Sequence, residues 1–112
     1  MSDSTNPARA LSRQLNDAAI SAVRSGDFQT AQRKWVEAAN ADPTFSGPPF
    51  NIARFMLDKG ARGADVLRVV EKYLDAAERN ASNGTEHEDI KILEQIPTLR
   101  QWLAQRKMTI GI

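Results

Sequence analysis

The chain of 112 residues contains no cysteine, so disulfides, thiolate chemistry and cysteine metal sites are excluded. Its single histidine is His87. Metal sites normally need three or more ligands, and a serine nucleophile needs an activating base. We interpret His87 as a solvated residue in the acidic first turn of a helix, where carboxylates favour the positive end of the helix dipole. We therefore expect no enzymatic activity, no cofactor and no metal.

A charge excess of either sign is also missing. Fifteen basic and fourteen acidic residues give a net charge of +1, so bulk electrostatics favour neither nucleic acid nor an anionic membrane. No stretch approaches the roughly 18 apolar residues of a membrane span. Residues 1–10 lack the basic start and apolar run of a secretory signal. By default we expect a cytoplasmic protein, with neither membrane nor nucleic acid as its main partner.

The composition is typical of a folded protein, with 41% hydrophobic and 26% charged residues, and the length suits one small domain. The clearest pattern is a pair of segments on either side of Gly26, in which small or apolar residues recur at helical spacing. These residues are Leu15, Ala18, Ala19 and Ala22 before the turn, and Ala31, Trp35, Ala38 and Ala39 after it. Alanine lets two helix axes approach closely, so the pattern predicts an antiparallel hairpin with Trp35 buried beside it.

This hairpin resembles one tetratricopeptide repeat (TPR), whose period is about 34 residues. The resemblance is carried by Gly26, Phe28, Ala31, Trp35, Ala38 and Pro43, within residues 12–45. The family usually has Trp, Gly and Tyr in its first helix, where this chain has Leu15, Ala19 and Ala22. A second face, Pro49, Ile52, Ala53 and Met56, follows about one period later and supports a second repeat.

The resemblance implies an all-α fold of about six helices in three antiparallel hairpins, stacked as a right-handed superhelix. We expect one TPR-like domain over 8–107, made of repeat one (12–45), repeat two (46–82) and a degenerate capping hairpin (85–106), between a disordered segment 1–7 and a tail 108–112.

Local signals predict the bounds of the helices. They indicate helices from residue 7 or 8 to 24, from a cap at 27 to 41, from 46–49 to 59, and from 64 or 65 to 80. In the fourth helix we expect Val69, Tyr73, Ala76 and Ala77 to form the packed face. A capping box of Thr85 and Glu88 predicts a fifth helix from Glu86, with Ile90, Leu93 and Ile96 on one side. Pro97 is expected to end it, leaving Leu99, Trp102 and Leu103 on a short sixth helix that ends near Arg106.

In TPR proteins the first helix of each hairpin lines a concave groove that usually binds a peptide or a partner helix. By this resemblance the expected partner-binding residues are Arg13, Asn16, Ile20, Arg24, Phe50, Asn51, Arg54 and Leu57. Exposed apolar members, together with Val23, would mark a contact patch; the alternative is that they pack between successive hairpins. At the fifth helix we expect Glu88, Asp89 and Ile92 to give the groove an acidic end.

These expectations favour a non-enzymatic adaptor or scaffold module whose partner is another protein or peptide. One alternative is a self-associating structural subunit that forms a homo-oligomer. Another is a nucleic-acid-binding helical repeat, although basic and acidic residues alternate between 54 and 79 and indicate a mixed solvated surface. The carboxylate clamp of chaperone-binding TPR proteins is matched only at Asn51.

Overall fold

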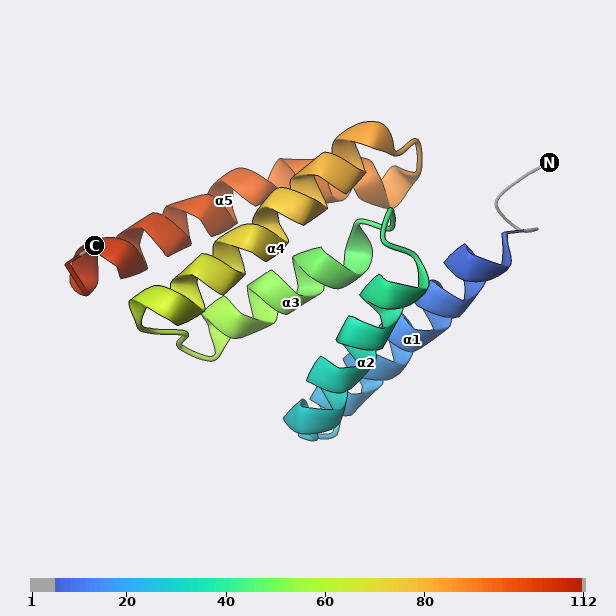
Figure 1. Cartoon of the computed structure of the whole chain (residues 1–112), viewed down its shortest axis with the longest axis horizontal. Coiled ribbons are helices and arrows are strands. Elements are labelled where there is room, and N and C mark those ends of the chain that lie inside the picture. Colours follow the sequence, from blue (N-terminus) through green and yellow to red (C-terminus); the bar gives the residue numbers. More distant parts are fainter. Residues whose placement is uncertain (1–5, 112) are drawn as a thin grey trace.

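The computed structural model describes residues 6–111, which form five α-helices and no strand (Figure 1). The all-α prediction is therefore confirmed for this part of the chain. The disorder that we predict for residues 1–7 falls largely on residues 1–5, which lie outside it, whereas Asn6 caps the first helix and Pro7 begins it. The helices are α1 (Pro7–Arg24), α2 (Phe28–Ala41), α3 (Gly47–Asp58), α4 (Ala64–Asn83) and α5 (His87–Thr109).

The first two helices form the predicted hairpin, with the predicted bounds. Gly26 has φ of +82°, which glycine adopts without steric cost, and this turns the chain between them. The carboxylate of Asp27 then accepts the Thr30 amide at 3.2 Å and caps α2. Ala19, Ala31 and Ala38 are fully buried, so small side chains allow the two helices to pack closely.

The remaining helices α3, α4 and α5 lie side by side, with the α1–α2 hairpin at an angle to them (Figure 1). Helix α3 belongs to both parts. Its Ile52 and Phe55 join the core of α1 and α2, whereas its Phe50, Ala53 and Leu57 join the core of α4 and α5. The two parts are therefore held together by opposite faces of a single helix.

Trp35 is 3% exposed and packs with Phe55, their ring centroids 5.4 Å apart. The prediction that it is buried between the first two helices and the third is confirmed. Its indole N–H, however, has no hydrogen-bond acceptor among the described residues. Nearly all buried polar groups are paired, so this donor is an exception in an otherwise apolar core.

The expected break at Pro97 is wrong, because α5 continues through it as one helix. Proline removes one backbone hydrogen bond, at a cost of about 3 kcal/mol in a helix interior. Against this cost, α5 buries apolar residues on both sides of Pro97 in one core: Ile92, Ile96, Leu99 and Leu103. Burying a side chain of this size contributes about 1.5–3 kcal/mol, so packing outweighs the lost bond. Five helices therefore replace the six that we expected.

The expected faces of the last helices are right only in part, since Ala77 and Ile96 are buried as expected but other members are not. Helix α4 buries Leu67, Val70 and Leu74, while Val69 is 41% exposed. Helix α5 buries Ile92 and exposes 57% of Ile90. The reason is that α4 packs on both α3 and α5, so its buried face is set by two neighbours and not by the spacing of the first repeat.

The start of α5 differs in the same way. Its capping box is formed by Glu86 and Asp89, one residue beyond the expected pair. Asp89 is buried and accepts hydrogen bonds from Ser46 Oγ at 2.6 Å and from the Glu86 amide at 3.0 Å. The Asp89 side chain, which also accepts a hydrogen bond from the loop before α3, decides this cap. The spacing of residues near the cap cannot predict that contact.

Candidate functional site

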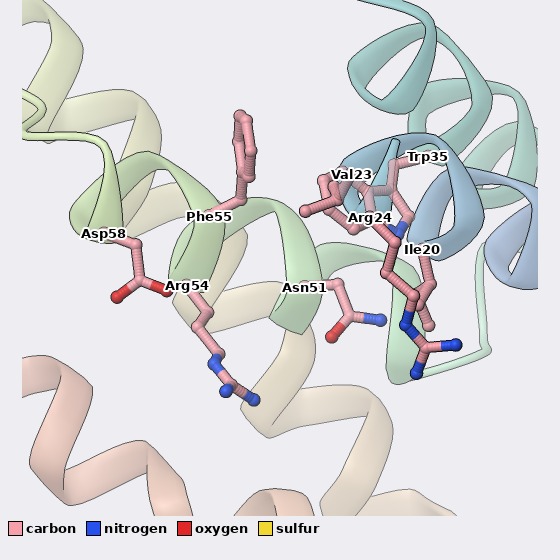
Figure 2. Close-up of a pocket in the computed structure, with 8 residues that line it drawn as sticks. All are labelled: Ile20, Val23, Arg24, Trp35, Asn51, Arg54, Phe55 and Asp58. Carbon is pink, nitrogen blue, oxygen red and sulfur yellow. The ribbon is translucent and has the colours of Figure 1, made fainter. Parts of the chain in front are cut away.

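A cleft of about 340 Å³ lies between the second half of α1 and the outer face of α3 (Figure 2). Residues from three helices line it: Ile20, Val23, Arg24, Trp35, Asn51, Arg54, Phe55 and Asp58. Four of these, namely Ile20, Arg24, Asn51 and Arg54, are among the predicted partner-binding residues.

Helical spacing explains why these side chains meet. Residues three, four or seven apart share one helix face. On α1 this places Ile20, Val23 and Arg24 together; on α3 it places Asn51, Arg54 and Asp58 together. The core formed by α1, α2 and α3 holds the two faces opposite each other.

The inner side of the cleft is aromatic, and its outer side is polar. Figure 2 shows Trp35 and Phe55 on one side, while the side chains of Arg24, Asn51 and Arg54 extend toward the other. Trp35 and Phe55 are buried, whereas the two arginines are exposed. A ligand in this cleft would therefore meet apolar surface inside and donors at the rim.

The two arginines of the rim have no ion-pair or side-chain hydrogen-bond partner among residues 6–111. By contrast, Arg9, Arg13, Arg68, Arg100 and Arg106 all have such partners. Each free guanidinium presents a planar set of donors that suits a carboxylate or a carbonyl oxygen. Arg24 lies in the last turn of α1, where a positive charge is also favoured by the helix dipole.

Asn51, which lines the cleft, is hydrogen-bonded to Asn16. Asn51 Nδ2 donates to Asn16 Oδ1 at 3.0 Å. The pair fixes the orientation of the Asn51 amide and leaves its carbonyl oxygen and second N–H available to a ligand. Asn16 therefore acts on the cleft through Asn51, because it does not line the cleft itself.

Arg13, which we predicted to be partner-binding, is engaged within the protein. It forms an ion pair with Glu88 at 2.9 Å and another with Glu86, and it lies over the Phe45 ring at 5.0 Å. Burial alone would lower the pKa of Arg13, but Glu88 and Glu86 outweigh it, so the pKa is raised. The start of α1 is thus tied to the start of α5, and Arg13 is not free for a partner.

Four further residues that we expected in the groove are not available to a partner either. Phe50 is 4% and Leu57 1% exposed, because α3 is covered by α4 and α5 on that side. The prediction that these two residues form an exposed patch is wrong, because both are buried in the core that α3 shares with α4 and α5. Glu88 is paired with Arg13, and Asp89 is buried, so the expected acidic end of the groove is not free.

A second hollow of about 300 Å³ lies between α3 and α5. It is lined by Leu57, Asp58, Trp102, Gln105 and Arg106. Trp102 is 40% exposed, whereas its neighbours Leu99 and Leu103 are buried. Asp58 could have been found from the sequence, since it lies seven residues after Asn51 on the same face. Trp102 could not, because its exposure depends on the register of α5.

No group of three histidine, aspartate or glutamate side chains within residues 6–111 lies close enough together to hold a metal ion. None of the helices in this range combines the length and apolar character that crossing a bilayer requires.

Comparison of the chain with protein-family models, with curated proteins and with solved structures finds no match. The TPR resemblance therefore stays a prediction from the residues of the first hairpin and from the recurrence of its face in α3.

Proposed function

We propose that this chain is a TPR-like, non-enzymatic interaction module that binds a peptide segment of another protein in the cleft between α1 and α3. The observation that carries the proposal is the pair of exposed arginines, Arg24 and Arg54, at the rim of a cleft with an aromatic inner side. Each arginine lacks a partner among the described residues, so neither contributes an ion pair to the fold.

The cleft has the size and chemistry of a small recognition site. Ligand pockets commonly measure about 300–1,000 Å³ and combine apolar walls with a few directed polar groups. At about 340 Å³ the cleft holds one or two side chains and not a whole folded surface. An extended peptide, or one turn of a helix, matches this scale.

Different residues of the cleft would make different kinds of contact with the peptide. Ile20, Val23 and Phe55 offer apolar contact to a side chain of the peptide, and this burial supplies affinity. Arg24 and Arg54 supply charge-assisted hydrogen bonds to an acidic side chain, and Asn51 can pair with the peptide backbone. The ring of Trp35 lines the same space and adds apolar surface, while its indole N–H is buried and has no acceptor among the described residues.

The experiment is a selection of 12-residue peptides from a displayed random library against the full chain. We expect selected peptides to carry an acidic residue, and Arg24→Glu with Arg54→Glu to lower their affinity at least tenfold, since hydrogen bonds to charged groups are worth about 1.5–3 kcal/mol each.

The matched control is Arg33→Glu with Arg79→Glu, which makes the same change of net charge at two exposed arginines outside the cleft. Circular dichroism must show that both double variants are folded. The proposal is wrong if no peptide is enriched, or if the two double variants lose affinity equally.

A further inference from the structure

The cleft between α1 and α3 and the hollow between α3 and α5 share one lining residue. Asp58 lines both, at the carboxyl end of α3. A peptide that is held at the first site and extends past Asp58 would reach the hollow that Trp102 lines.

The charges along this path change sign. Arg24 and Arg54 come first, and Asp58 follows Arg54 by four residues, which is about 6 Å along a helix axis. Asp58 is exposed and has no ion pair with another described residue. Its side of the path therefore attracts a positive group, whereas the arginine side attracts a negative one.

Two further residues of the hollow fix what it can bind. Trp102 presents part of its indole to the hollow, and a cation over an aromatic face is attracted by the ring quadrupole. Arg106 is also there, but its guanidinium donates to Leu57 O at 2.8 Å and to Ala61 O at 2.9 Å. Its donors are thus occupied by carbonyl groups at and just after the end of α3, and it forms no ion pair with Asp58.

We propose that Asp58 and Trp102 form a second subsite, which binds a lysine or arginine side chain of the same peptide whose acidic side chain lies between Arg24 and Arg54. This proposal rests on the proposed function. Asp58 pairs with the cation, and the indole of Trp102 packs against it. The ligand is then a peptide with charges of both signs, in a fixed order across α3.

The spacing of those charges follows from geometry. An extended peptide advances about 3.3 Å per residue and presents alternate side chains to one face. Two charged side chains on that face are two or four residues apart, and about 7 Å or 13 Å then separates them. The shorter separation is close to the rise along α3 from Arg54 to Asp58. The longer separation suits a peptide that extends from Arg24 on α1 toward Trp102 on α5.

The experiment uses one selected peptide and its variant in which the basic residue is replaced by norleucine, which keeps the aliphatic length without the charge. Both are titrated against the wild-type chain, Asp58→Asn, Trp102→Leu and Trp102→Phe. Trp102→Leu keeps an apolar side chain, whereas Trp102→Phe also keeps an aromatic face. Because Asp58 and Trp102 are exposed or half-exposed, all three variants are expected to fold.

We expect the selected peptides to be enriched in lysine or arginine two or four residues from the acid. Norleucine should weaken binding to the wild type threefold to tenfold, and should have little further effect on Asp58→Asn or Trp102→Leu. Trp102→Phe should retain most of the difference.

The inference is overturned, and the proposed function stands, if peptides bind through the arginine pair without such enrichment. It is also overturned if norleucine weakens binding to Asp58→Asn and Trp102→Leu as much as to the wild type. If no peptide is selected, both fail.

Discussion

Replacing Trp35 by alanine tests the packing that holds the cleft together. Trp35 is 3% exposed and lies in the core that α1, α2 and α3 share. Its loss removes the aromatic wall of the cleft and the contact with Phe55. The same chain offers a matched control, because Trp102 is 40% exposed.

The magnitude can be worked from the structure. A buried tryptophan removes about 150–250 Å² from water, which at about 25 cal/mol per Å² gives about 4–6 kcal/mol. The pair with Phe55 adds about 0.5–1.5 kcal/mol. Against this, the mutation removes an unpaired N–H whose burial costs about 1–3 kcal/mol. The middle of each range gives a net loss of about 4 kcal/mol, which lies within the usual range of about 3–5 kcal/mol for large-to-small aromatic changes in cores.

The measurement is urea unfolding followed by circular dichroism, since the mutation removes a fluorophore. Trp35→Ala should lower the midpoint with little change in the slope. Trp102→Ala should cost about 1 kcal/mol or less. Trp35→Phe keeps an aromatic ring and deletes the unpaired donor, so its loss of stability should lie between those of the two alanine variants. The reasoning is refuted if Trp35→Ala costs less than about 1 kcal/mol, or if both alanine variants lose the same stability.

Three other predictions concern the fold. Pro97→Ala should raise the free energy of unfolding by about 2 kcal/mol, because it restores a helical hydrogen bond at the expense of a more flexible unfolded chain; an unchanged urea midpoint would contradict this. Gly84→Ala should lower it by about 1–3 kcal/mol, since a Cβ there would collide with the buried Asp89 carboxylate, and a neutral result would contradict this packing. For Asp42, burial raises the pKa, but hydrogen bonds from Thr44 and Arg9 outweigh it, so the pKa is lowered. The stability that the Asp42 carboxylate contributes is fully present above its unfolded pKa of about 3.9 and is lost as the pH falls through its folded pKa. The free energies of unfolding of wild type and Asp42→Asn should therefore converge as the pH is lowered.

The first hairpin and the start of α3 could be predicted because their signals are local. Gly26, the Asp27 cap and the alanine spacing each act within a few residues, and together they specify the hairpin and the burial of Trp35. Four of the eight residues that line the cleft, Ile20, Arg24, Asn51 and Arg54, were expected from the resemblance to a TPR. Helical spacing explains why they share faces, but it does not by itself indicate which face binds a partner.

The rest depends on contacts between distant residues. Whether Pro97 ends α5 is decided by the core on both sides of it, and whether Phe50 is exposed is decided by α4 and α5. Arg13 is lost to the site through Glu86 and Glu88, more than seventy residues away in the chain. Such partners cannot be read from spacing, because nothing local indicates which charges meet.

The most direct test of the central claim is to map where a selected peptide binds by NMR on the ¹⁵N-labelled chain. We predict that the largest shift changes occur at the amides of Arg24, Asn51 and Arg54, and at the indole N–H of Trp35. The indole of Trp102 serves as a second, separate signal for the α3–α5 hollow. Shift changes confined to the outer face of α4, around Val69 and Arg79, or to the end of the chain from Met108 to Gly111, would contradict the account.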